Sequence, residues 1–321
     1  MGDRVGAAAH QEDTKPENPP RYEANRESVA RLMRLATYAS VTVASILIVA
    51  KLGAWLATES VSLLSSFVDS LLDVGASLAN LFAVRHALQP ADREHRFGHG
   101  KAEALAGLAQ AAFIAGSGVF LILEAVDRFI NPRAVANGDI GIIVMVVALV
   151  LTIGLVMFQS HVVKETGSVA IEADSLHYRV DILVNVAVIV SLFIASYGEL
   201  PLADPLFAIA IVIYMGLGSW KIGQKAIDDL MDREFPDEDR IKIREIAMRH
   251  PKVRHVHDMR TRSSGPYSFI QIHLEMDKTL TLIEAHEISD EVMYSVEKEF
   301  PNTEVLIHQD PEGVEERRDD I

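Results

Sequence analysis

The chain has 321 residues and a formal net charge of −15 at pH 7, and it contains no cysteine. The acidic balance argues against a nucleic-acid partner, because phosphate binding needs a basic surface. Without cysteine neither a disulfide nor a thiolate metal site can form, so His, Asp or Glu must hold any transition metal. Apolar residues concentrate between residues 35 and 220 and charges lie toward both ends, which indicates a membrane body with soluble flanks.

Six apolar segments are long enough to cross a bilayer, which takes about 20 residues in a helix. They lie at about 35–57, 60–85, 103–126, 140–160, 172–196 and 202–220. The N-terminal stretch is polar and lacks the apolar core of a signal peptide. We therefore predict a disordered tail over 1–30, a six-helix transmembrane domain over 31–220, a soluble domain over 221–313 and a C-terminal tail over 314–321.

The placement of Lys and Arg predicts that both termini face the cytoplasm, because cytoplasmic loops are enriched in these residues. One side of the membrane would carry Arg21, Arg26, Arg31, Arg34, Arg85, Arg93, Arg96, Lys101, Lys164, Lys221 and Lys225. The loops on the other side hold only Arg128 and Arg133.

The soluble segment predicts a small α+β domain of order αββαβ. A helix follows Pro236, and alternating polar and apolar residues in "VRHVHDMRTR" and "YSFIQIHLEM" are typical of strands. "SSGP" between them predicts a hairpin turn. "TLIEAHEISDEVMYSVEKEF" predicts a second helix and "TEVLIHQD" a third strand.

Ionisable residues interrupt the second and fifth apolar segments. Asp69 and Asp73 are four residues apart on one helix face, and His177 and Asp181 repeat that spacing. One Asp at the centre of a membrane helix costs roughly 2.5–3.5 kcal/mol, so unpaired carboxylates are unfavourable. Four such ligands around one point suit Zn²⁺, Cd²⁺ or Fe²⁺, whereas Mg²⁺ and Mn²⁺ prefer six oxygens. Hydrogen bonds between helices, or a place among lipid headgroups, would explain one polar residue but leave three carboxylates without a cation.

A second group of candidate ligands lies in the loop "PADREHRFGHGKAE". Asp92, His95 and His99 can make a three-ligand zinc site with water or a neighbouring group as the fourth ligand. A polar loop that happens to be rich in histidine is the alternative. Lys101, at the start of the next helix, is expected to pair with an acid elsewhere, for which Asp232 is a candidate.

The soluble domain holds a third group of candidate ligands on its strands and second helix: His257, His273, His286, His308 and Asp310. Asp310 shares a strand face with His308, and Asp290 shares a helix face with His286. These residues allow one metal site or two linked sites. "HEISD" at 286–290 resembles the HExxH of zinc peptidases, but it ends in Asp and lacks a third ligand at the usual spacing, which argues against a peptidase.

Taken together, these motifs resemble the cation diffusion facilitator family, and within it the bacterial zinc and ferrous-iron exporters. "DSLLD", "PADREHRFGHGKAEALAGLAQ", "EADSLHYRVD", "HDMRTR", "IQIHLEM" and "IHQDP" match in order and spacing over about residues 30 to 312. The longer acidic N-terminal tail and the Arg179–Val180 pair depart from the family pattern outside its sites.

The resemblance implies a homodimer in the bacterial inner membrane, with six transmembrane helices and a cytoplasmic metallochaperone-like, ferredoxin-like domain that binds metal and dimerises. It assigns Asp69, Asp73, His177 and Asp181 to the transport site and Asp92, His95 and His99 to a loop site. His257, His273, His286, His308 and Asp310 match a binuclear site that bridges the dimer, and Lys101 with Asp232 matches a salt bridge at the membrane boundary. Zn²⁺ would be both substrate and structural ion, and no organic cofactor is expected.

These features predict a secondary active transporter that exports Zn²⁺, or Cd²⁺ or Fe²⁺, in exchange for protons by alternating access, rather than an enzyme. A site of carboxylates and imidazole must lose protons to bind a divalent cation, so metal and protons compete for it. Two alternatives remain at this point: a metal-responsive membrane receptor that binds Zn²⁺ without moving it, and an intramembrane metallohydrolase, which would need an open coordination position and a general base.

Overall fold

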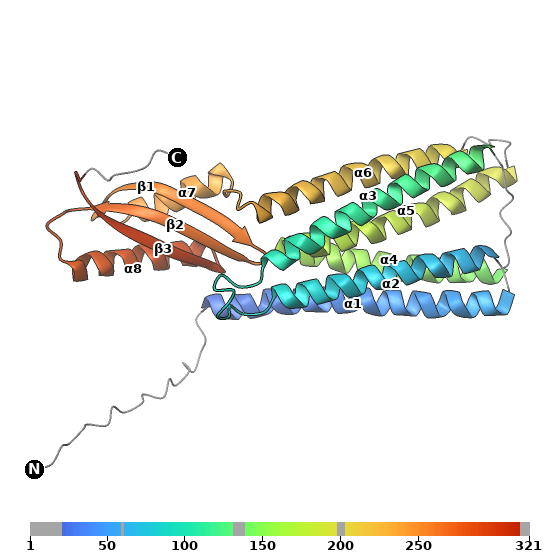
Figure 1. Cartoon of the computed structure of the whole chain (residues 1–321), viewed down its shortest axis with the longest axis horizontal. Helices are drawn as coiled ribbons and strands as arrows, with labels where there is room; N and C mark the ends of the chain where they lie inside the picture. The colour runs from blue at the N-terminus through green and yellow to red at the C-terminus, as the bar shows by residue number, and fades with distance from the viewer. Residues whose placement is uncertain (1–20, 59–60, 131–138, 198–202, 315–321) are drawn as a thin grey trace, which may run out of the picture.

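The computed structural model describes residues 21–58, 61–130, 139–197 and 203–314. A bundle of long helices occupies one end of an elongated molecule, and a small sheet domain occupies the other (Figure 1). The helices of the bundle are α1 (Arg21–Thr58), α2 (Val61–Ala87), α3 (Lys101–Ile130), α4 (Asp139–Thr166), α5 (Val169–Tyr197) and α6 (Ala203–Leu230). The predicted six-helix domain is confirmed.

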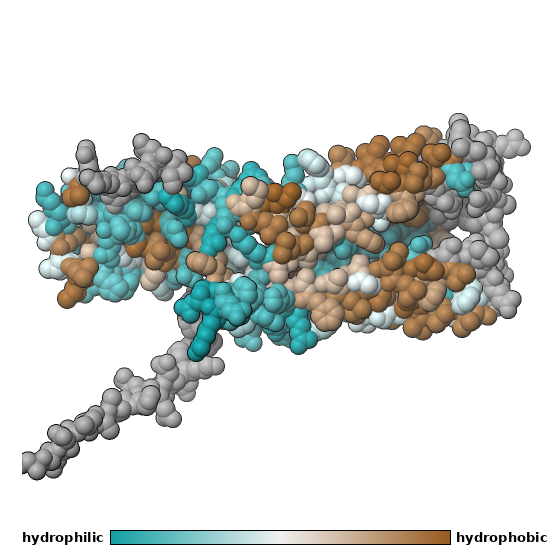
Figure 2. All heavy atoms as spheres, in the orientation of Figure 1, coloured by the Kyte–Doolittle hydropathy of each residue, from teal (hydrophilic) through white to brown (hydrophobic). Residues whose placement is uncertain are grey.

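Five of these helices, α1, α2, α3, α4 and α6, are long and apolar enough to span a membrane within the described residues. The sixth, α5, carries Glu172, Asp174, Arg179 and Asp181 in its first half, and its side chains beyond residue 190 lie outside the described ones. Large apolar side chains on the bundle point outward, as Phe82, Phe120 and Leu217 do. Hydrophobic residues accordingly cover much of the outer surface of the bundle, while hydrophilic residues cover much of the sheet domain (Figure 2). This distribution suits a bundle whose outer surface meets lipid.

Two sets of helices make up the bundle. α1 packs against α2 and α4, and α3 packs against α5 and α6. Contacts of α5 with α4 and α2, and of α2 with α3, join the two sets. Asp174, His177 and Tyr178 of α5 are accordingly buried, whereas Arg179 is exposed.

The bundle helices extend beyond the predicted apolar segments. α1 begins at Arg21, so residues 21–30, which we assigned to a disordered tail, are helical, and residues 1–20 lie outside the described part of the chain. α6 continues to Leu230, ten residues past the predicted limit at residue 220. Apolar runs predict the part of a helix in lipid, whereas the backbone hydrogen bonds continue into the charged segments that follow. Arg133, which we used for the topology prediction, lies outside the described residues.

The sheet domain has the predicted order αββαβ, with α7 (Asp237–Met248), β1 (Val253–Ser264), β2 (Tyr267–Met276), α8 (Leu282–Glu299) and β3 (Thr303–Pro311). β2 is central, antiparallel to β1 and parallel to β3. The predicted hairpin turn is confirmed, and Gly265 takes the positive φ of 60° that it requires.

One face of the sheet packs on both helices of this domain. Ile270, Ile272 and Leu274 alternate along β2 and are buried with Ile246 of α7 and Val292 of α8. The intervening residues of β2, which include His273, therefore lie on the other face of the sheet.

Candidate metal centres

The first cluster joins α2 and α5 inside the bundle. Nε2 of His177 lies 3.0 Å from Oδ1 of Asp73 and 3.7 Å from Oδ2 of Asp181. Each of the three residues offers a ligand atom within 4.8 Å of the others. Burial is uneven, since the side chain of His177 is 11% exposed and that of Asp181 is 35% exposed. One nitrogen and two carboxylates around one point form a donor set suited to a divalent transition-metal ion.

Asp69, the fourth residue predicted for this cluster, lies outside the three-residue group in this structure. It precedes Asp73 by one helical turn on α2 and is more exposed than Asp73. Beside it, Nζ of Lys51 on α1 donates a hydrogen bond of 2.7 Å to Oγ of the buried Ser70. Lys51 therefore points into the helix packing.

Behind His177 lies a buried polar network that the sequence analysis missed. Oδ2 of Asp174 accepts hydrogen bonds from Oγ of Ser40 at 2.6 Å and from Nε2 of Gln159 at 2.7 Å. The hydroxyl groups of Tyr178 and Ser77 lie 2.8 Å apart. Asp174 is 1% exposed, so it is the most enclosed of the carboxylates near His177. Its position three residues before His177 on one helix was the available signal, because residues so spaced lie side by side.

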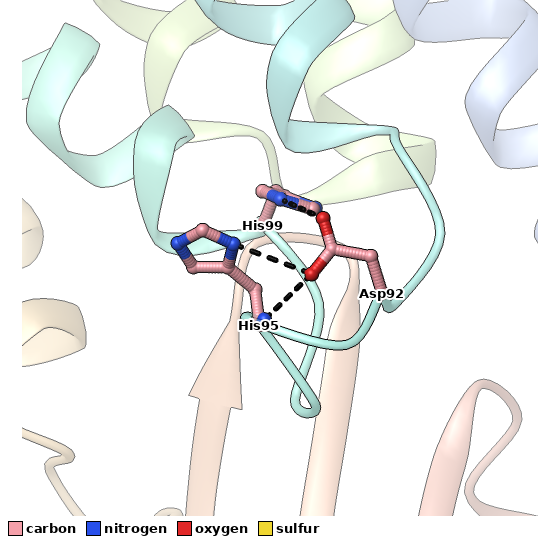
Figure 3. A group of neighbouring side chains, drawn as sticks. All are labelled: Asp92, His95 and His99. Carbon is pink, nitrogen blue, oxygen red and sulfur yellow. Dashed lines mark hydrogen bonds and ion pairs between the residues drawn. The ribbon is translucent and has the colours of Figure 1, made fainter.

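Asp92, His95 and His99 come together in the loop between α2 and α3. The carboxylate of Asp92 lies between two imidazoles, with Oδ1 3.4 Å from Nδ1 of His95 and Oδ2 3.4 Å from Nε2 of His99 (Figure 3). Ligand atoms of all three lie within 4.8 Å of one another. Gly98, with a φ of 79°, makes the tight turn that brings the two histidines to the same carboxylate.

Local backbone geometry orients Asp92. Its Oδ1 accepts hydrogen bonds from the backbone N–H of His95 at 2.6 Å and of Glu94 at 2.9 Å. The bond from His95 is the main cause that holds the pKa of Asp92 below its usual value, and the bond from Glu94 and the two nearby histidines add to it. Asp92 is thus an ionised carboxylate already turned toward both imidazoles.

The third cluster lies on the face of the sheet opposite α7 and α8. Register places His257 beside His273 and His273 beside His308 on neighbouring strands. Oδ2 of the buried Asp310 lies 3.1 Å from Nε2 of His257 and 2.8 Å from Nδ1 of His273, and its Oδ1 lies 3.0 Å from Nε2 of His308. Ligand atoms of His257, His273 and Asp310 lie within 4.8 Å of one another and can hold a zinc ion, whereas His308 contacts the other oxygen of Asp310 and lies outside this three-residue group.

Two further residues change the predicted set. His286 is not in this cluster: it lies on α8, exposed, with its Nε2 3.6 Å from Oδ2 of Asp290. α8 packs on the opposite face of the sheet, so His286 cannot join the strand histidines within one chain. Asp258, which we did not predict, stands 3.6 Å from Nε2 of His273. Its backbone has a φ of 43° at an irregularity in β1, which no sequence pattern indicated.

The predicted pair of Lys101 and Asp232 is present at the junction of bundle and sheet domain. Nζ of Lys101 lies 2.9 Å from Oδ1 of Asp232, and that oxygen also lies 3.5 Å from Nη1 of Arg262 in β1. The guanidinium carbon of Arg262 lies 4.4 Å from the ring centre of Phe97 and 4.7 Å from that of Phe269, and these two rings contact each other edge to face with centres 5.5 Å apart. The loop that carries Asp92, His95 and His99 is thereby attached to the sheet domain.

Close backbone approach strengthens this junction. A Cβ placed on Gly100 would lie 2.0 Å from the carbonyl oxygen of Ser264. Only glycine allows the loop to approach the β1–β2 turn so closely.

A multi-span helical domain with a carboxylate–imidazole cluster between its helices, joined to a soluble domain with a further cluster, is the architecture of a membrane transporter for metal cations. Residues 37–231 match the family model for the cation efflux transmembrane domain, and residues 235–312 match that for the cytoplasmic domain of cation efflux proteins. The chain belongs to the cation efflux, or cation diffusion facilitator, family, as its motifs predict.

Individual relatives agree with the family models. The chain is 47% identical over 288 residues to the cation-efflux pump FieF of Klebsiella pneumoniae subsp. pneumoniae, which covers 90% of this chain and 96% of the relative. It is also 47% identical over 285 residues to FieF of Escherichia coli O139:H28, covering 89% of this chain and 95% of that one. A solved structure of the zinc transporter CzrB in its zinc form is 33% identical, with a TM-score of 0.25, and covers 27% of this chain and 99% of its own.

Proposed function

We propose that this protein exports Zn²⁺ from the cytoplasm in exchange for protons, by alternating access, and that Cd²⁺ and Fe²⁺ are further substrates. The family defines divalent metal efflux. The observation that supports the finer proposal is the cluster of Asp73, His177 and Asp181 between α2 and α5 of the helical bundle. With Asp69 from the next turn of α2, it would offer one nitrogen and three carboxylates, a set suited to Zn²⁺.

Exchange for protons follows from the chemistry of this cluster. Carboxylates and imidazole must be deprotonated to bind a divalent cation, so metal binding releases protons. When the metal leaves on the outer side, the crowded negative charge favours proton uptake. We assign the proton at neutral pH to Nε2 of His177, because an imidazole titrates near pH 6.5 in water and Asp73 lies 3.0 Å away to accept its hydrogen bond.

The loop and sheet clusters would hold resident metal on the cytoplasmic side. The fit is good in both cases, because each offers two or three imidazoles around one carboxylate, the nitrogen-rich donor set that Zn²⁺ favours. His286 is exposed on α8 and is free of that cluster, so we propose that it binds metal at the contact with a second copy of the chain. We propose that the protein is a homodimer in the bacterial inner membrane, with both termini of each chain in the cytoplasm.

The test is zinc uptake into sealed proteoliposomes that carry an imposed pH gradient. Wild type is compared with Asp73→Ala and with Asp127→Asn, an acid of α3 outside all three clusters. Uptake that follows the gradient in wild type and in the control variant, but is lost in Asp73→Ala, supports the proposal. Zinc binding without gradient-driven uptake would contradict it and favour a receptor.

His177 has a separate test. The variant His177→Ala should weaken zinc affinity and flatten the dependence of transport on pH. If its transport kept the pH dependence of wild type, the assignment of the proton to His177 would be wrong.

A further inference from the structure

The loop site is short of one ligand. Asp92, His95 and His99 supply three ligands, whereas zinc sites that hold their ion permanently use four protein ligands and sites that exchange water use three. Whether the protein supplies a fourth ligand therefore determines whether an ion at the loop site is resident or exchangeable. This inference rests on the loop site proposed above but not on transport.

His86 stands beside the site. It lies in the last turn of α2, and the centre of its ring is 4.8 Å from the ring centre of His99. The corresponding distance between His95 and His99, two of the site's own ligands, is 4.5 Å. Two imidazoles bound to one tetrahedral Zn²⁺, each at a Zn–N distance of about 2.0 Å, have ring centres roughly 5 Å apart. The distance between the ring centres of His86 and His99 is therefore the distance expected for two histidines that bind the same zinc ion.

His99 is also incompletely partnered. Its side chain is 5% exposed, and its Nε2 lies 3.4 Å from Asp92. Its Nδ1 is buried and makes no hydrogen bond to the described residues. A buried polar atom without a partner is unfavourable, so the surroundings of His99 leave one polar atom of its ring unsatisfied, on the side away from Asp92.

We propose that His86 is the fourth ligand of the loop site. Its ring is exposed, so rotation about its own side-chain torsions, rather than movement of α2, would turn a nitrogen toward the other three ligands. The donor set would then be one carboxylate and three imidazoles, closed to water. The ion would be resident, not in transit to the membrane cluster.

A four-ligand ion has a mechanical consequence. His86 belongs to α2, which also carries Asp73. His99 lies two residues before the start of α3. One ion bound to both would fix the cytoplasmic end of α2 to the start of α3. The ring contact between His86 and His99 could instead be ordinary aromatic packing, and the experiment separates the two.

The experiment uses the absence of cysteine from this chain. His86→Cys introduces a single thiolate, which is a strong ligand for Co²⁺ and Zn²⁺. It is made in the full chain with Asp73→Asn and Asp310→Asn, so that the loop site dominates Co²⁺ binding. Arg85→Cys in the same background is the matched control, because neighbouring positions on a helix face about 100° apart. The Co²⁺-loaded proteins are compared by absorption.

We expect a sulfur-to-cobalt charge-transfer band in the near ultraviolet for His86→Cys and none for Arg85→Cys. We also expect His86→Phe, which keeps an aromatic ring, to lower loop-site Co²⁺ affinity at least about tenfold. A thiolate band absent from His86→Cys, or unchanged affinity in His86→Phe, overturns the proposal. His99→Ala, which should abolish loop-site binding, shows whether the site itself exists: if binding persists there, the loop site and the role of His86 both fail, whereas gradient-driven transport is measured independently.

Discussion

Nε2 of His177 on α5 lies 3.0 Å from Oδ1 of Asp73 on α2, and this contact ties the two helices together inside the bundle. α2 and α5 meet over a small region only, so the polar cluster is a large part of their contact. Binding of a metal ion or a proton at this cluster therefore changes the interaction between α2 and α5. Alternating access requires such a change, because the site must face one side of the membrane at a time.

Asp69 gives the first prediction. Although this structure leaves it outside the three-residue group, we expect Asp69→Asn to lower zinc affinity at the membrane site at least about tenfold, because three ligands leave a tetrahedral zinc ion incomplete. Isothermal titration of the purified protein measures this, with Asp127→Asn as control. Wild-type affinity in Asp69→Asn would show that Asp73, His177 and Asp181 bind the metal without it.

The buried network around Asp174 gives the second prediction. Asp174→Asn places an amide where two donors, from Ser40 and Gln159, now meet one carboxylate oxygen. A buried donor or acceptor left without a partner costs about 1–3 kcal/mol, so the variant should unfold at a lower temperature. Thermal unfolding in detergent measures this.

A double-mutant cycle with Ser40→Ala tests whether the network acts as a unit. Since Ser40 and Asp174 share one hydrogen bond of 2.6 Å, the two losses should not add. Strict additivity, or an unchanged melting temperature in Asp174→Asn, would mean that the network contributes little to the bundle.

Much of this arrangement could be predicted because it depends on periodicity. The spacing of four residues places His177 and Asp181 on one helix face, and alternation places His273 on the face of β2 opposite Ile272 and Leu274. The long apolar runs predicted the helices of the bundle, and Gly265 predicted the hairpin.

Sequence patterns did not predict features that are determined by which elements pack against a residue. Asp174 is read as one more polar residue near a membrane surface until α1 and α4 are seen to enclose it. Residue type alone does not show that His286 lies on the other face of the sheet from the strand histidines within one chain, and its predicted part in a site that bridges two chains stays a prediction. Nothing in "HDMRTR" indicates that Arg262 contacts one aromatic ring from the loop and one from the sheet, those of Phe97 and Phe269.

The loop site gives the third prediction, which concerns pH. The backbone N–H of His95 is the main group that holds the pKa of Asp92 below its usual value. The carboxylate of Asp92 is therefore ionised at any pH above the usual pKa of an aspartate, and it takes up a proton only at a pH below that. Protonation of Asp92 should therefore not be what lowers loop-site metal affinity between pH 5 and 7. Asp92→Asn should lower the affinity at every pH in this range without changing its slope against pH.

The measurement is Co²⁺ titration at several pH values in the background that lacks the other two sites. His95→Gln is the contrasting variant, since loss of one imidazole should make the affinity less steep against pH. A slope that changes in Asp92→Asn would show that the carboxylate itself titrates in this range.

The junction of the two domains gives the last prediction. Oδ1 of Asp232 faces both Lys101 at 2.9 Å and Arg262 at 3.5 Å, so Asp232→Asn removes two ion pairs whereas Lys101→Gln removes one. Partly exposed pairs contribute about 0–1 kcal/mol each, so both effects should be modest, with that of Asp232→Asn the larger. The φ of Asp232 is 56°, a left-handed conformation that Asn tolerates, so backbone strain does not confound the comparison.

Hydrogen exchange in the loop at residues 92–100 measures this loosening, because Arg262 connects that loop to the sheet domain through Phe97. Exchange should be faster in Asp232→Asn than in Lys101→Gln. Asp228→Asn is the control, since Asp228 pairs with Arg233 instead. Equal exchange in the two junction variants would mean that Arg262 is held by Phe97 and Phe269 alone, and that its pairing with Asp232 adds nothing to the attachment of the loop.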